Sequence, residues 1–106
     1  MTERKAPRHP ARFRTFFSSG AEEGEGTARD LSKLGCRVES ATVFPVGTEV
    51  EVWLFSPDFD WPLKVDKAVI RWTATESFGA EFLEVGTVQR ERLRRLIAAG
   101  NLGATG

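Results

Sequence analysis

Two short sets of residues in this sequence have the types and spacing needed to bind an anion. The first is a pair of arginines, Arg4 and Arg8, four positions apart in a leader (residues 1–14) that is strongly basic. A basic segment of this kind is attracted to phosphate, whether in a nucleotide, a nucleic acid or a lipid. The same composition is also typical of a solvated, flexible tail.

The second set is the run Asp30-Leu31-Ser32-Lys33-Leu34-Gly35, directly before an expected strand. Asp and Ser two positions apart commonly shape a turn by hydrogen bonding to the local backbone. Gly35 permits either a positive φ or the close approach of a ligand. Taken alone, this run is compatible with an ordinary turn as well as with a binding site.

Catalysis has few candidate residues. The chain holds one His, one Cys and no Tyr, which leaves little for general acid–base or nucleophilic chemistry. His9 lies in the basic leader and is expected to be exposed. Cys36 is in phase with Val38, which predicts a small buried residue rather than a reactive thiol. We therefore expect a protein that is not an enzyme and holds neither a cofactor nor a metal ion.

Length and charge narrow the class further. The 106 residues fit one domain, and 15 Lys and Arg balance 15 Asp and Glu. No run approaches the ~20 apolar residues of a membrane-spanning helix, and no apolar stretch follows the leader as in a secretory signal. Together with the single cysteine, these features predict a cytoplasmic protein without membrane insertion.

The middle of the chain has the two-residue alternation of half-buried strands. Strands are expected at 12–18, 36–40, 48–55, 63–75 and 77–84. Within 63–75 the apolar phase slips between Val65 and Ala68, which predicts a bulge or a break. The residues expected on one apolar face after the slip are Ala68, Ile70, Trp72 and Ala74.

Turn formers, Gly24 and Gly26 among them, separate these runs. Five or six strands then occupy residues 11–84. Because a small sheet must hide its edges, closure into a β-barrel is expected.

One helix is expected from Thr87 to Ala99, with Leu93, Leu96 and Ile97 on one face and Gly100 as its terminator. It would cover one open end of the barrel, although its arginines could instead contact a partner or an anionic surface. This division predicts a flexible arginine segment at 1–10, a domain at 11–100 and a frayed tail at 101–106.

The two sets of residues together resemble the signature of the PilZ family. That signature is Arg-x-x-x-Arg in an N-terminal segment, matched by Arg4 and Arg8, followed by Asp/Asn-x-Ser-x-x-Gly, matched by Asp30, Ser32 and Gly35. The segment Phe-Gly-Ala-Glu-Phe at 78–82 and the arginine-rich helix also look like this family. The resemblance implies a six-stranded antiparallel β-barrel with a C-terminal α-helix, acting as a receptor for the bacterial second messenger cyclic di-GMP.

By this resemblance, Arg4 and Arg8 clamp the guanines and phosphates, for which the planar guanidinium is suited. Asp30 accepts hydrogen bonds from a guanine edge, Ser32 adds a polar contact and Gly35 leaves room for the ligand. Arg37, two residues further on, is either an additional ligand arginine or a solvated strand residue. Binding would order residues 1–10 over the barrel and signal to an unknown downstream protein.

Three alternatives stay open. Arg8 and Arg12 also form Arg-x-x-x-Arg, although Arg4 and Arg8 fit the spacing better. The position before the last motif glycine, often glycine in the family, is Leu34, so a PilZ-like protein-interaction module that does not bind nucleotide is the main rival. A nucleic-acid-binding barrel is less favoured, because Glu49 and Glu51 share the strand face of Trp53 and Phe55 and would repel phosphate.

Overall fold

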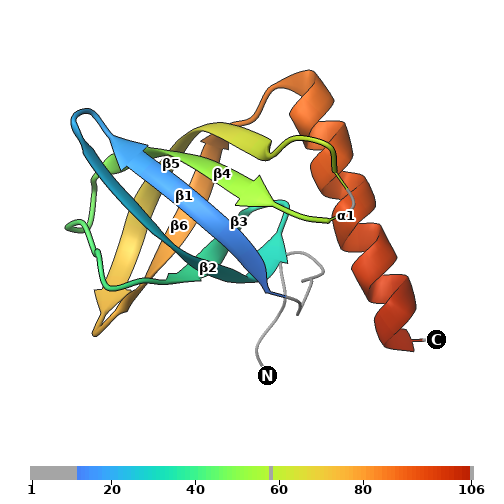
Figure 1. Cartoon of the computed structure of the whole chain (residues 1–106), viewed down its shortest axis with the longest axis horizontal. Helices are drawn as coiled ribbons and strands as arrows, with labels where there is room; N and C mark the ends of the chain where they lie inside the picture. Colours follow the sequence, from blue (N-terminus) through green and yellow to red (C-terminus); the bar gives the residue numbers. More distant parts are fainter. Residues whose placement is uncertain (1–11, 58, 106) are drawn as a thin grey trace.

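The computed structural model describes residues 12–57 and 59–105, with side chains described up to Ala98. Six strands and one helix follow one another along the chain (Figure 1). They are β1 (Phe13–Ser19), β2 (Glu22–Ser32), β3 (Gly35–Glu39), β4 (Glu49–Phe55), β5 (Leu63–Ala74), β6 (Ser77–Glu84) and α1 (Thr87–Thr105).

The six strands form a closed antiparallel barrel in the order β1-β2-β3-β6-β5-β4. Strand β1 closes the ring because it pairs with β2 along one edge and with β4 along the other. The predicted fold class, a six-stranded antiparallel barrel with a C-terminal helix, is therefore confirmed.

The core lies inside the ring and is built from the residues of each strand that point inward. Phe17 is fully buried and meets Phe44 and Phe78 edge to face, with ring centroids 5.7 and 5.0 Å apart. Val52 and Leu54 of β4 face the same interior, as their alternation predicted. Thr15 is the buried polar residue of β1, and its hydroxyl donates a hydrogen bond to the carbonyl of Trp53 at 2.8 Å.

Strand β2 was missed because Gly24 and Gly26 were interpreted as turn formers. Both lie inside β2, where neighbouring atoms leave no room for a side chain. A Cβ at Gly24 would lie 2.6 Å from Cζ of Phe17, and one at Gly26 would lie 2.1 Å from the carbonyl oxygen of Glu39. Glycine in a strand often marks such a close approach. The actual turn is at Gly20, which has φ 61°.

The predicted phase slip in β5 is confirmed. The pairing of β5 with β6 shifts register between Lys67 and Ala68. As a result Val65 and Ala68, three residues apart, both lie in the core. A second shift follows between Ile70 and Trp72. It turns Trp72 and Ala74 out to solvent, so the prediction that they share the apolar face with Ile70 is wrong.

Helix α1 lies across the end of the barrel where β4 finishes and β5 begins (Figure 1). Leu93, Leu96 and Ile97 belong to the core cluster, as predicted. The helix does not end at Gly100 but continues to Thr105. A glycine inside a helix costs only about 1 kcal/mol relative to alanine, and the residues after it are compatible with helix.

The close packing of β2 against β3 makes a stability prediction. Replacing Gly26 with alanine forces the Glu39 carbonyl to move, and we expect the free energy of unfolding to fall by about 1–3 kcal/mol. Urea denaturation measures the change. Gly86→Ala is the matched control, since its nearest atom, Oδ2 of Asp66, would lie at an ordinary contact distance of 3.8 Å. Equal stabilities of the two variants would contradict this account of β2.

Candidate ligand-binding site

A hollow of about 400 Å³ opens on the outer surface of four neighbouring strands, β2, β3, β6 and β5. Its lining includes four of the residues predicted from sequence, namely Asp30, Ser32, Gly35 and Arg37. The other lining residues are Leu34, Cys36, Arg71, Trp72, Gly79, Ala80 and Glu81. The hairpin of β2 and β3 thus supplies one wall, and β5 and β6 supply the other.

Asp30 occupies an irregular position in β2. Its φ is 56°, in the left-handed region that Asp tolerates better than most residues. The pairing of β2 with β3 shifts register between Arg29 and Ser32, so Asp30 lies within a bulge. A bulge changes the direction in which the neighbouring side chains point. Here Leu31 enters the core while Asp30, beside it, remains partly exposed at the hollow.

Ser32 holds the turn between β2 and β3. Its hydroxyl oxygen accepts a hydrogen bond from the backbone N–H of Leu34 at 3.1 Å, and the hydroxyl donates to the carbonyl of Gly35 at 3.4 Å. The predicted turn-forming role of Ser32 is therefore present. The residue is buried, with 8% of its surface exposed, at the floor of the hollow.

Gly35 does not have a positive φ. A Cβ at this position would lie 2.1 Å from the carbonyl oxygen of Ala80, in the neighbouring strand β6. Its lack of a side chain therefore makes room for β6, and the hollow depends on that close pairing.

Two ion pairs connect the outer faces of β2 and β3, and a third joins two residues of β3. Nε of Arg37 lies 3.4 Å from a carboxylate oxygen of Asp30, and its Nη2 lies 3.7 Å from Glu39, which also binds Arg29 at 3.1 Å. The contact between Arg37 and Asp30 has the distance of an ion pair but not the geometry of a hydrogen bond. Nε of Arg37 is also buried from water, so among the described residues it is a buried donor without a hydrogen-bond partner. Such a donor costs free energy that a better-placed acceptor could recover.

Among the lining residues that were not predicted as site residues, Arg71 and Trp72 of β5 have side chains suited to a ligand. Trp72 is 43% exposed, and its indole lies over Gly79, its register partner in β6. A Cβ at Gly79 would lie 2.0 Å from Nε1 of Trp72. Arg71 donates a hydrogen bond to the carboxylate of Glu81. A signal for Trp72 was present in the sequence, because Gly79 within Phe-Gly-Ala-Glu-Phe has no side chain and can leave room for an aromatic ring of the preceding strand.

The predicted arginines Arg4 and Arg8 lie outside the described residues. Arg12, from the alternative pairing with Arg8, is described and exposed. It lines a different hollow, beside the loop between β4 and β5, and does not line the one that contains Asp30.

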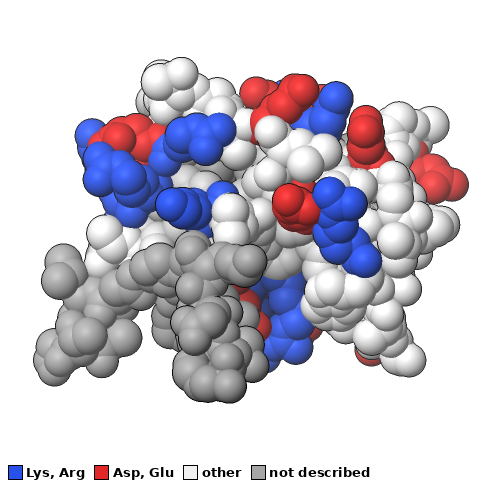
Figure 2. All heavy atoms as spheres, turned by 180° about the vertical axis from the view of Figure 1, so that it is seen from behind, with Lys and Arg blue, Asp and Glu red and all other residues white. Residues whose placement is uncertain are grey.

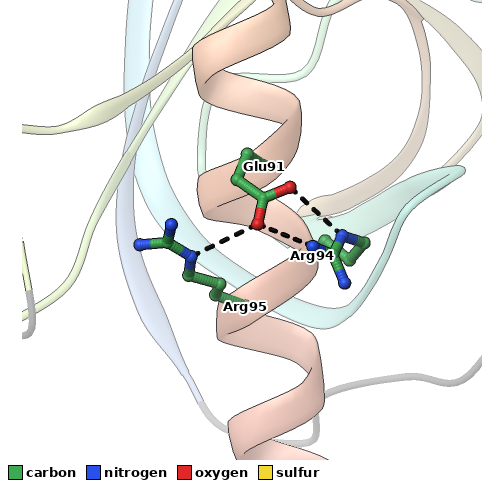
Figure 3. Close-up of polar contacts among 3 residues, drawn as sticks. All are labelled: Glu91, Arg94 and Arg95. Atoms are coloured by element: carbon green, nitrogen blue, oxygen red, sulfur yellow. Dashed lines mark hydrogen bonds and ion pairs between the residues drawn. The ribbon is translucent and has the colours of Figure 1, made fainter.

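The arginines of helix α1 are partly neutralised within the helix itself. Glu91 accepts hydrogen bonds from Arg94 and Arg95, three and four residues further along (Figure 3). These bonds, that from Arg94 first, lower the pKa of Glu91, and the same carboxylate raises the pKa of Arg94. On the face drawn in Figure 2, many basic and acidic side chains likewise lie next to one another.

Comparison with known proteins identifies the PilZ family, which the signature residues also resemble. Residues 2–99 match the PilZ domain, so the chain belongs to the PilZ domain family. Members of this family are non-catalytic receptor domains that generally bind cyclic di-GMP, in agreement with the prediction that the chain is not an enzyme.

Two solved structures have the same fold. One is the Bacillus subtilis inhibitor of motility (MotI/DgrA), with a TM-score of 0.80 and 18% identity. The match covers 97% of this chain but 53% of that one, so the chain spans about half its length. The other is the PilZ domain of CeSA from a cellulose-synthesizing bacterium, with a TM-score of 0.70 and 19% identity over 87% of this chain and 95% of that one. No curated protein matches the chain.

Among the described residues, no helix is both long enough and apolar enough to cross a membrane.

Burial of Cys36 makes a prediction about its reactivity. Desolvation raises the pKa of this thiol to about 12, and the thiolate is the reactive form. We expect alkylation by iodoacetamide at pH 8 to be far slower than in the urea-unfolded chain, and to accelerate as the pH is raised. Mass spectrometry of timed samples measures the rate. Equal rates in the folded and unfolded chain would show that the thiol is accessible.

Proposed function

We propose that this chain is a receptor for cyclic di-GMP and binds it in the hollow formed by β2, β3, β5 and β6. The observation that carries the proposal is the convergence of Asp30, Ser32, Arg37, Arg71 and Trp72 on that one hollow. These residues come from separate segments of a domain whose family generally binds this ligand.

The chemistry of the lining suits a cyclic dinucleotide. The ligand presents flat guanine rings, hydrogen-bonding edges and two phosphates. A carboxylate such as that of Asp30 can accept bonds from the N1–H and N2–H₂ groups of guanine. Arginine can bind phosphate or the O6 and N7 edge of guanine through two parallel bonds. The exposed indole of Trp72 offers a surface on which a base can stack.

Binding would exchange internal ion pairs for contacts to the ligand. In the structure, Asp30 is paired with Arg37, and Arg71 with Glu81. A guanine edge on Asp30 and a phosphate on either arginine would replace these partners. Because Nε of Arg37 has no hydrogen-bond partner among the described residues, replacing its present contact with Asp30 would cost little free energy.

Arg4 and Arg8 complete the proposed site from the leader. Two guanidinium groups four residues apart can contact one ligand only if the segment lies across it. Ligand binding would then fix residues 1–10 over the barrel and change the surface offered to a downstream protein in the cytoplasm.

A second candidate function is a PilZ-like protein-interaction module that does not bind nucleotide. The carboxylate of Glu81 lines the hollow and would oppose a phosphate there, which favours this candidate. Leu34, at the motif position often held by glycine, is 45% exposed at the rim and could contact a protein.

Calorimetric titration with cyclic di-GMP distinguishes the two candidates. We expect the wild type to bind, and Asp30→Ala or Arg8→Ala to weaken binding by roughly 10- to 150-fold, the effect of losing a charge-assisted contact of ~1.5–3 kcal/mol. Asp66→Ala is a matched control, because this exposed carboxylate does not line the hollow. Absence of heat with wild type at tens of micromolar would favour the interaction module.

NMR tests the proposed ordering of the leader. We expect the backbone signals of residues 1–10 to shift and to lose their fast internal motion when cyclic di-GMP is added to saturation. Arg4→Ala should reduce this response more than Arg12→Ala if Arg4 and Arg8 form the binding pair. The opposite order would assign binding to Arg8 and Arg12.

A further inference from the structure

A second feature lies on the other side of the barrel ring, around β1 and β4, away from the proposed cyclic di-GMP site. It is a groove of about 460 Å³ between the start of β1, the end of β4 and the loop that leads to β5. We call it the aromatic groove, and its main lining residues are Arg12, Arg14, Phe55, Phe59, Asp60 and Trp61. Trp61 is 64% exposed, an unusual amount for the largest apolar side chain.

Arginines hold the aromatic rings of this groove in place. The guanidinium of Arg92, from α1, lies 4.3 Å from the ring centroid of Phe59 and 5.8 Å from that of Trp61. It also donates hydrogen bonds to the carbonyls of Trp61 and Pro62. Arg14 lies 5.2 Å from the ring of Phe55. Cation–π contacts of this kind, together with hydrogen bonds to the backbone, fix the loop without neutralising the cations.

The charge of the groove is unbalanced. Arg12, Arg14 and Arg92 form no ion pair with any described carboxylate. In contrast, carboxylates bind five arginines elsewhere, namely Arg29, Arg37, Arg71, Arg94 and Arg95. Asp60 is the acidic side chain among the described lining residues. Within the described part of the chain, the groove therefore combines an exposed apolar ring with arginines that form no ion pair.

We propose that the aromatic groove is a docking site for a segment of a partner protein in which acidic residues flank an apolar side chain. The apolar side chain would cover Trp61, and carboxylates would pair with Arg12 and Arg14. Residues 1–11 of this chain are a poor occupant, because they carry Arg4, Lys5 and Arg8 against Glu3 and share the sign of the groove.

A nucleic acid fits the surroundings less well than an acidic peptide. Towards the start of β4, away from the groove, the outer face that carries Phe55 also carries Glu51 and Glu49. Asp66 of β5 lies within 4 Å of Lys64, which also pairs with Glu51. A polyanion that extends from the groove would meet these carboxylates, whereas a short peptide with one or two carboxylates would not.

Selection from a displayed library of random peptides on the full chain tests the proposal. We expect enriched peptides to contain Asp or Glu beside Leu, Phe or another large apolar residue. When added as synthetic peptides, they should shift the NMR signals of residues 55–62 and of the Trp61 indole N–H. Arg14→Gln should weaken binding at least about ten-fold, and Trp61→Ala should weaken it as well.

Matched variants outside the groove separate docking from general charge or apolar attraction. Arg94→Gln and Leu83→Ala remove the same kinds of exposed group and should leave peptide binding unchanged. The proposal is overturned if no peptide is enriched, or if the groove variants bind the peptides as well as wild type does. It is also overturned if oligo(dT), and not the acidic peptides, shifts the Trp61 signal and loses binding in Arg14→Gln.

Discussion

Closing six strands into a ring constrains the rest of this structure. A sheet can close only when its strands are tilted and their registers staggered. In this barrel the regular pairing breaks at the bulge between Arg29 and Ser32 and at two shifts along β5. Those breaks are also where the outer surface gains unusual side chains. Asp30 lies in the first, and Trp72 follows the last. The hollow lies between these two breaks in the pairing.

The same residues that line the hollow also build it. Ser32 closes the hairpin turn, Gly35 admits β6 at close range, and Gly79 gives the indole of Trp72 its resting place. An Asp-x-Ser-x-x-Gly sequence therefore carries structural information as well as ligand-binding information. Its presence agrees with the PilZ fold whether or not a nucleotide binds. Arg71 and the incompletely bonded Arg37 form only partly exposed ion pairs, so they distinguish a receptor from a scaffold more sharply.

Sequence patterns predicted the elements that follow simple rules. The alternation of apolar and polar residues predicted β3, β4 and β6. The slip after Val65 predicted the bulge in β5, because a change of phase is visible in the order of the apolar residues. The failures have physical causes. Gly24 and Gly26 resemble turn formers, and only their distance to Phe17 and Glu39 in space shows why β2 needs them. Trp72 was assigned to the interior because the second register shift depends on pairing with β6. For the same reason Arg71 and Trp72 were missed, whereas the resemblance to the PilZ signature led to Asp30, Ser32, Gly35 and Arg37, which line the hollow.

The closed ring has a consequence for how other molecules recognise this domain. Many small β-proteins capture an extended segment by adding it as an extra strand, with main-chain bonds that are indifferent to side-chain identity. Among the described strands of this barrel every edge is already paired. Recognition on the outside of the ring must therefore pass through side chains, where one substitution can change the choice of partner and leave the fold intact.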